Sequence, residues 1–151
     1  MFCLHLIVSG GQTGVDRAAL DVALELGIPC GGWCPKNRLA EDGSIPARYP
    51  LTETPSVDYA ERTRWNVRDS DATLVLTFGE PSGGTAFTVE CARMERKPCL
   101  VIDLDEAVSP SLAVEWLRTH AVGILNVAGP RASANPAAYE RARDFLFHLL
   151  K

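Results

Sequence analysis

The sequence predicts an α/β fold, in which a parallel sheet of about five strands is covered by helices on both faces. Three observations predict it. Short apolar runs alternate along the chain with amphipathic stretches of helical length. Glycine-rich turns follow two of the apolar runs, and the length of 151 residues suits a single domain, residues 1–151, that buries its own core.

The chain begins with a strand and a helix. Residues 4–8 form a short apolar run ahead of a glycine pair, which is typical of a buried parallel strand. Residues 15–26 place alanine, valine and leucine on one helical face, and Gly27 and Pro29 end this helix. A short and weaker strand is expected at 28–31.

Residues 33–56 contain four prolines and show little periodicity. A stretch this long without regular structure in a small domain is usually functional. Lys36 and Arg38 either close over a phosphate or lie in solvent. Trp33 either packs in a core or stacks on a base or pterin ring.

The rest of the chain continues the alternation of helices and strands. Apolar runs predict strands at 72–78, 99–104 and 123–127. Periodic stretches predict helices at 57–68, 85–96, 111–120 and 136–150, and Pro136 suits the first turn of the last one. Right-handed crossovers between parallel strands then place helices on both faces of the sheet.

Two glycine-rich turns lie where a strand gives way to a helix, the first at Ser9–Gly14 and the second at Glu80–Thr85. Glycine allows a ligand to approach the backbone, and the start of a helix offers unpaired N–H groups. Such turns either bind an anion, usually phosphate, or simply reverse the direction of the chain, and neither matches a dinucleotide fingerprint or a P-loop. The carboxyl ends of parallel strands share one edge, so both turns and the turn at Arg131 would meet there.

These turns supply the candidate binding residues for a nucleotide or another phosphorylated small molecule. The candidates are Gly10, Gly11, Gln12, Thr13, Gly14, Gly83, Gly84, Thr85 and Arg131. The fork of Arg131 fits an oxyanion. Asp16, in the first turn of its helix, either complements the helix dipole or contacts the ligand. No catalytic constellation stands out, and Glu90 is the one candidate acid of the helix after the second turn.

Composition excludes several classes of function. The net charge of −4 argues against sequence-independent binding to nucleic acid. No apolar run reaches the length of a membrane span and no signal peptide is evident, so a cytoplasmic location is expected. Five scattered cysteines suit a reducing compartment. Cys30 and Cys34 lack a second ligand pair, so no tightly bound metal is expected from side-chain ligands.

Several short motifs together carry a resemblance to a known family. They are Ser9–Asp16, Gly32–Pro35, Ala40–Gly43, Ile45-Pro46, Arg62-Thr63, Asn66-Val67, Asp69–Thr73, Gly83–Thr85 and Leu125–Arg131. With them the chain resembles the putative molybdenum carrier family. That family is a circularly permuted branch of the superfamily that includes the Lonely Guy phosphoribohydrolases, the bacterial DNA-processing protein and molybdenum cofactor carriers.

The resemblance implies a Rossmann-like three-layer sandwich that binds a nucleotide, or the molybdenum cofactor, in a cleft at the strand ends. It also implies a homodimer or higher homo-oligomer. The phosphoribohydrolases carry a glutamate three residues after the Gly-Thr pair, and Thr88 occupies that position here. Glu90 lies two residues further, on a different side of the helix. A binding protein without chemistry is therefore expected, with a phosphoribohydrolase of nucleoside monophosphates and a nucleotide-sensing module as alternatives.

The last helix gives modest support to a dimer. Its apolar side is wide, with Phe147 pointing away from the other apolar residues of the helix. Such a width exceeds what one face of a sheet requires. Phe147 is either part of an interface or an exposed aromatic near a frayed terminus.

Overall fold

The computed structural model describes residues 4–151, and in this part of the chain five parallel strands form one sheet. The strands are β1 (Leu6–Val8), β2 (Cys30–Gly31), β7 (Ala72–Thr77), β8 (Cys99–Asp103) and β9 (Ile124–Ala128). Their order across the sheet is β2-β1-β9-β7-β8, and each neighbouring pair is parallel. The predicted α/β fold with a parallel sheet of about five strands is confirmed.

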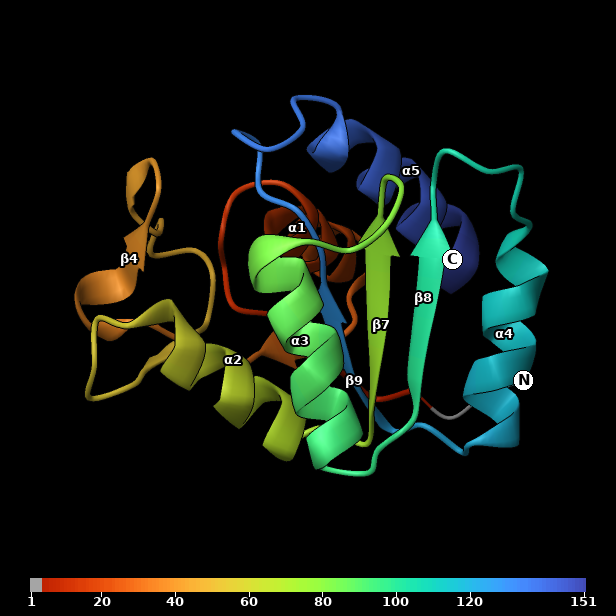
Figure 1. Cartoon of the computed structure of the whole chain (residues 1–151), viewed down its shortest axis with the longest axis horizontal. Coiled ribbons are helices and arrows are strands. Elements are labelled where there is room, and N and C mark those ends of the chain that lie inside the picture. Colours follow the sequence, from red (N-terminus) through yellow and green to blue (C-terminus); the bar gives the residue numbers. More distant parts are fainter. Residues whose placement is uncertain (1–3) are drawn as a thin grey trace.

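Helices cover both faces of the sheet, which makes the fold a three-layer sandwich (Figure 1). The helices are α1 (Val15–Leu26), α2 (Tyr59–Arg68), α3 (Gly83–Met94), α4 (Pro110–Thr119) and α5 (Ala138–Leu150). In Figure 1, α2 and α3 lie in front of the sheet, whereas α1 and α5 lie behind it. Helix α1 packs extensively on α5, and α2 packs on α3.

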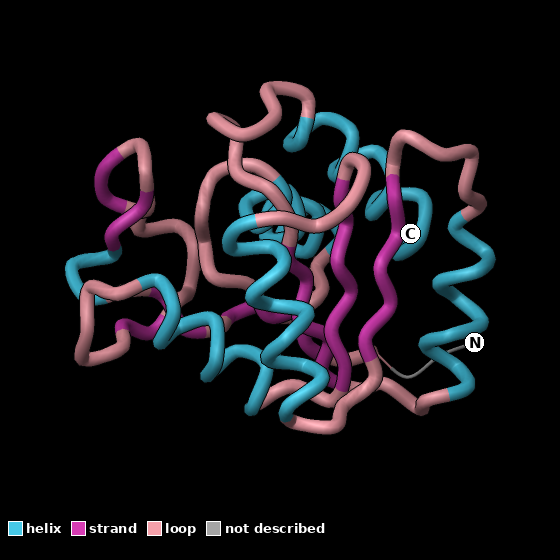
Figure 2. Tube along the Cα trace, in the orientation of Figure 1, coloured by secondary structure: helices cyan, strands magenta, loops and turns pink. Residues whose placement is uncertain are grey.

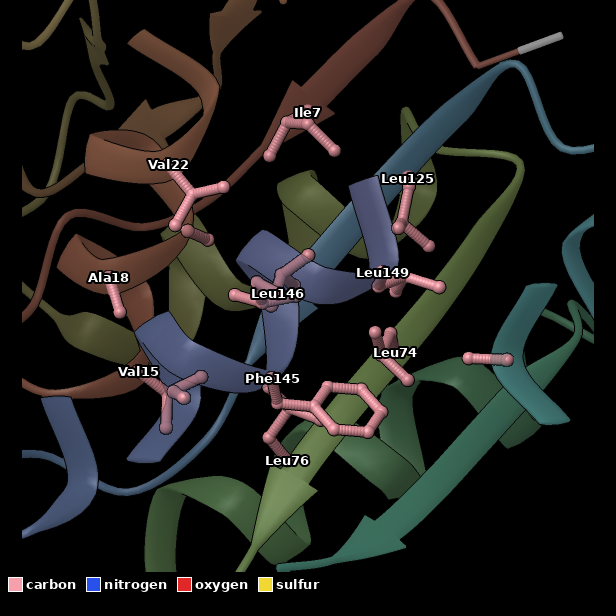
Figure 3. Close-up of a cluster of buried hydrophobic side chains, with 14 of the residues drawn as sticks. Ile7, Val15, Ala18, Val22, Leu74, Leu76, Leu125, Phe145, Leu146 and Leu149 are labelled. Carbon is pink, nitrogen blue, oxygen red and sulfur yellow. The ribbon is translucent and has the colours of Figure 1, made fainter. Parts of the chain in front are cut away.

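The main core lies between the sheet and the layer of α1, α4 and α5 (Figure 3). Figure 3 shows Ile7, Leu74 and Leu125 of the sheet facing side chains of α1 and α5 such as Val22 and Leu146, all of which are fully buried. Burying aliphatic side chains of this size stabilises a fold by about 1.5–3 kcal/mol each. This face therefore supplies most of the hydrophobic stabilisation.

The opposite face of the sheet is more polar. A small apolar cluster joins α2 and α3, and it includes Val67, Cys91 and Ala92. The buried residues of β7 and β9 include Thr73, Thr77 and Asn126, and the amide of Asn126 donates to the hydroxyl of Thr73 at 3.3 Å. Buried polar groups cost free energy unless they have partners, so their gathering on one face indicates a site.

The strand order reverses at the centre of the sheet. The chain passes from β1 through α1 to β2 on one side, and from β7 through α3 to β8 on the other. Strand β9 is inserted between β1 and β7, and α1 and α3 cover opposite faces. In α/β sheets, ligands bind outside the carboxyl ends of the strands at such a reversal.

The segment 33–56 contains more regular structure than the sequence predicts (Figure 2). It forms two short strand pairs and a single 3₁₀ turn: β3 (Trp33–Cys34) with β6 (Thr52–Glu53), β4 (Leu39–Ala40) with β5 (Gly43–Ser44), and η1 (Lys36–Arg38). The Arg38 guanidinium donates to four backbone carbonyls of the segment at 2.8–3.3 Å. Arg38 thus neither closes over a phosphate nor lies in solvent, because it holds this segment together.

Trp33 also has a structural role. Its indole Nε1–H donates to a carboxylate oxygen of Asp69 at 2.9 Å, and its ring lies edge-on to Trp65 at 4.8 Å between centroids. The side-chain amide of Asn66 brackets the Trp33 backbone by accepting from its N–H and donating to its carbonyl. These contacts attach the start of the segment 33–56 to α2.

Candidate functional site

A cavity of about 590 Å³ opens at the carboxyl ends of β1, β9 and β7, between α2 and α3. Pockets for small ligands span roughly 300–1,000 Å³. Its walls come from five parts of the chain: the turn before α1, the first half of α2, the end of β7, the first half of α3 and the turn after β9. The lining residues that the argument uses are Gln12, Asp16, Tyr59, Arg62, Glu80, Gly83, Gly84, Thr85, Phe87, Thr88 and Arg131.

The N-terminus of α3 faces this cavity without a side-chain cap. The amides of Thr85 and Ala86 donate to the Ser82 carbonyl, whereas those of Gly83 and Gly84 have no acceptor among the described residues. A Cβ at Gly83 or Gly84 would meet nothing within 4 Å, so the space in front of both is open. Unpaired amides and the helix dipole together favour an anion here.

The turn before α1 has a different character, because its own side chains occupy its amides. The Gly11 amide donates to Ser9 Oγ, that of Gln12 to Asp16 Oδ2, and that of Thr13 to Gln12 Oε1, at 3.1–3.3 Å. Among the residues of this turn that the structure describes, only Gln12 borders the cavity and only Gly10 borders a small compartment beside it.

The other predicted residues of this first turn pack against protein. Gly11, with φ +79°, lies against Leu51 and Ile45. Gly14, with φ +81°, lies against the carbonyl of Pro130. The Thr13 hydroxyl accepts from the amide of Ala132 at 3.1 Å and donates to Glu41. Packing and backbone conformation thus account for the glycines at 11 and 14.

Asp16 and Arg62 form a buried pair on the floor of the cavity. Arg62 Nη1 lies 3.8 Å from Asp16 Oδ2, which is too long for a hydrogen bond. The side chains are only 13% and 5% exposed, and Arg62 Nε is buried without a partner among the described residues. Burial raises the pKa of Asp16 from 3.8 to about 6, more than Arg62, the Gln12 amide and Arg17 lower it.

The folded protein disfavours the ionised form of Asp16. A carboxyl whose pKa is raised despite a neighbouring guanidinium loses more from desolvation than it gains from attraction. The Arg62 guanidinium also packs directly on Gly10, where a Cβ would lie 2.6 Å from Nη1. A group in a cleft whose pKa is shifted by burial and by a charged partner is a candidate for a functional site.

A small polar compartment of about 10 Å³ continues from this floor. Its walls include Asp16, Arg62, Thr88, Asn66 and Asn126. This volume is at the lower limit for a single water molecule, and its polar walls offer several hydrogen-bonding partners. The floor of the cavity can thus place one small polar group beside the Asp16 carboxyl.

Arg131 and Glu80 lie at the rim. Arg131 borders the cavity and is half exposed, and its Nε lies 3.6 Å from Glu41 Oε1. Hydrogen bonds from Ser133 and Thr13, together with Arg131, lower the pKa of Glu41. The Glu80 side chain is exposed. Arg131 is therefore available to an anion only in competition with Glu41.

Helix α3 presents a hydroxyl to the cavity and turns its glutamate away. Thr88 is buried in the wall and donates to the Gly84 carbonyl at 3.0 Å. Glu90 lies outside the cavity on the exposed side of α3, where it pairs with Arg93, and this hydrogen bond lowers the pKa of Glu90. The geometry gives Glu90 no contact with a ligand in the cavity.

Sequence reasoning placed Gln12, Gly83, Gly84, Thr85 and Arg131 at what the structure shows to be one cavity. It did not single out Arg62, and it left Asp16 open. One signal could have identified Arg62. Polar residues at 62, 63 and 66 share one face of α2, and polar residues also interrupt the apolar strands at 73, 77 and 126. Two polar surfaces facing each other inside a fold indicate a site.

Neither a metal site nor a membrane span is found in residues 4–151. This part of the chain contains no group of three or more His, Cys, Asp or Glu side chains placed to hold a metal ion, and none of its helices is long and apolar enough to cross a membrane. The cysteines at 30, 34, 91 and 99 are free thiols. Cys3 lies outside the described residues.

Comparison with known proteins places this geometry in context. A family model described as "Circularly permutated YpsA SLOG family" matches residues 7–150. A crystal structure of a protein from Syntrophus aciditrophicus SB, named "Putative molybdenum carrier protein", superposes with a TM-score of 0.93 at 46% identity. The match covers 99% of this chain and 96% of the other. No curated protein matches the chain.

Proposed function

This chain belongs to the circularly permuted YpsA SLOG family, and we propose that it binds a nucleotide or a nucleotide-like phosphorylated ligand. The observation that carries the proposal is the uncapped start of α3, where Gly83 and Gly84 open onto the cavity. A phosphate there would accept from their amides and from the hydroxyl of Thr85, whose side chain makes no hydrogen bond with the described residues. Arg131 would add charge at the rim.

The rest of the cavity suits a ring system. Tyr59 and Phe87 contribute aromatic side chains to its walls. Aromatic side chains bury large apolar surfaces and stack on flat ligands. A ligand with a ring at one end and a phosphate at the other would match both parts. The first glycine turn would support the ring end through Gly10 and Gln12.

The name of the related crystal structure suggests one ligand of this kind. A molybdenum carrier would hold the pyranopterin phosphate of the molybdenum cofactor, which combines a fused ring with a phosphate. This group would be cargo and not a resident cofactor. Nucleoside monophosphates have the same division into ring and phosphate, so the cavity fits both classes.

Titration calorimetry with AMP, GMP and a pterin phosphate tests the proposal. Gly84→Ala is the decisive variant, because its Cβ meets nothing in the protein and would occupy space that the proposed phosphate needs. Binding by the wild-type protein and at least about tenfold weaker binding by Gly84→Ala are expected, with the melting temperature not lowered. Arg93→Gln, on the exposed side of α3, is the matched control. If none of the three ligands binds, or if Gly84→Ala binds them normally, the proposal is wrong.

A second candidate function is hydrolysis of a nucleoside monophosphate, and the compartment beside Asp16 favours it. A water molecule there would form a bond to the anomeric carbon while the N-glycosidic bond breaks. Asp16 would accept the proton of the water, and the departing base would take up a proton from solvent. Ribose 5-phosphate release that is lost in Asp16→Asn would support this reaction over simple binding. No release from a panel of monophosphates would exclude it for that panel.

A nucleotide-sensing module and a dimer remain further proposals. A sensor would bind tightly without turnover and would capture a partner protein only with ligand present.

For the dimer, α5 offers less support than its sequence suggests, because Phe147 is half-buried and packs against the main core under Lys151. Sedimentation at micromolar concentration tests the dimer directly, and a clean monomer would refute it.

A further inference from the structure

The floor of the cavity carries an acceptor and a donor side by side. Asp16 can only accept hydrogen bonds when ionised, and Arg62 can only donate. Asp16 Oδ2 accepts from the Gln12 amide, whereas Oδ1 has no hydrogen-bond partner among residues 4–151 and can receive a ligand N–H. Arg62 donates to the Thr63 hydroxyl at 3.2 Å and retains further N–H groups.

Charge decides which end of a ligand can lie here. A phosphate next to the buried Asp16 would place two anions together in a poorly solvated site. The start of α3 has no buried carboxylate and offers unpaired amides. The neutral end of the ligand therefore belongs on the Asp16–Arg62 floor, and its phosphate belongs at Gly83 and Gly84.

We infer that this floor selects ligands whose ring is a 2-amino-4-oxo heterocycle, as in guanine and the pterins. This inference rests on the proposed function. Such a ring presents a carbonyl, a ring N–H and an exocyclic NH₂ in a row. The two N–H groups would donate to the two oxygens of Asp16, and the carbonyl would accept from Arg62.

Other rings leave a buried group of this floor unpaired. Adenine presents an amine and an unprotonated ring nitrogen, which reverses the required order. Hypoxanthine keeps the carbonyl and ring N–H but lacks the amine, and xanthine replaces the amine with an oxygen that would face Asp16. A buried polar group without a partner costs about 1–3 kcal/mol, which corresponds to roughly 5- to 150-fold in affinity.

The walls around the floor favour a ring over a sugar. The Tyr59 ring lies 5.4 Å from the Arg62 guanidinium and borders the same cavity. A flat heterocycle that reaches Arg62 would thus stack beside Tyr59 while its edge meets the charged pair. A ribose diol could also bridge Asp16 and Arg62, but it would leave the aromatic wall without a flat partner.

The test compares the binding of GMP, IMP, AMP, XMP and ribose 5-phosphate by calorimetry. We expect the wild-type protein to bind GMP at least about fivefold more tightly than IMP, AMP or XMP. Asp16→Asn presents an NH₂ in place of one carboxylate oxygen, so it should lose affinity for GMP and gain affinity for XMP. This exchange of preference cannot arise from a general loss of structure.

Each failure has its own meaning. If all four nucleotides and ribose 5-phosphate bind equally and Gly84→Ala weakens them all, the phosphate site stands and the inference about the ring is wrong. If none binds, the proposed function fails first. If Asp16→Asn does not fold, the wild-type order of GMP, IMP, AMP and XMP still decides the inference. Equal affinities would overturn it.

Discussion

The two glycine-rich turns look alike in the sequence but differ in what fills them. In the turn before α1, Ser9, Gln12 and Asp16 occupy the amides, and the glycines at 11 and 14 pack against neighbouring chain. In the turn before α3, Gly83 and Gly84 face open space and the helix has no side-chain cap. Glycine thus permits close packing in the first turn. In the second turn, a φ of +53° also favours glycine at 83, and both glycines leave room for a ligand.

The largest expected effect is a loss of stability when the first turn is disrupted by a substitution. In Gly14→Ala, the new Cβ would collide with the Pro130 carbonyl, and the residue would keep an unfavourable φ of +81°. Strain and overlap together should lower the free energy of unfolding by roughly 3 kcal/mol or more. Urea denaturation measures this loss. Gly84→Ala is the paired control, and an equal loss in both variants would refute the distinction between the turns.

The next largest effect is a pH dependence of stability that arises from Asp16 on the floor of the cavity. The pKa of Asp16 is about 6 in the folded protein and 3.8 ordinarily, so the folded state binds this proton more tightly. The contribution of Asp16 to stability is complete below pH 3.8 and is lost as pH rises through 6. The loss amounts to about 3 kcal/mol.

Asp16→Asn removes this pH dependence. The variant should match the wild-type protein near pH 4 and should be more stable by up to about 3 kcal/mol at pH 8. Melting curves across this range, with Asp144→Asn as an exposed control, measure the difference. A variant that is less stable than the wild-type protein at pH 8 would show that attraction to Arg62 outweighs desolvation.

The elements could be predicted from the sequence because local signals define them. Helix α1 covers the predicted residues 15–26, since Gly27 with φ +71° ends it. The other four helices of residues 4–151 begin and end within two residues of their predicted limits. The insertion of β9 between β1 and β7 could not be predicted, because strand order depends on contacts between distant segments.

Some residues of the candidate site could likewise be predicted from local sequence, and others could not. Gly83 and Gly84 stand out locally, because a glycine pair opens a helix directly after a strand. Arg62 looks like one more charge in a polar helix, and only the packing of α2 on the turn before α1 brings it to Asp16 and Gly10. The first turn carries the same glycine signal as the second, and the sequence does not reveal that side chains within it occupy its amides.

A matched pair of threonines gives the smallest effect and sharpens the comparison. Thr13 in the first turn hydrogen-bonds to Glu41 and to the Ala132 amide, so Thr13→Val should lower the free energy of unfolding by about 1–2 kcal/mol. Thr85 in the second turn is largely buried, and its hydroxyl has no such partner in residues 4–151. Thr85→Val should therefore change stability by less than about 0.5 kcal/mol but weaken phosphate-ligand binding by about tenfold. Denaturation and calorimetry on both variants separate the two roles, and the reverse pattern would assign the phosphate to the first turn.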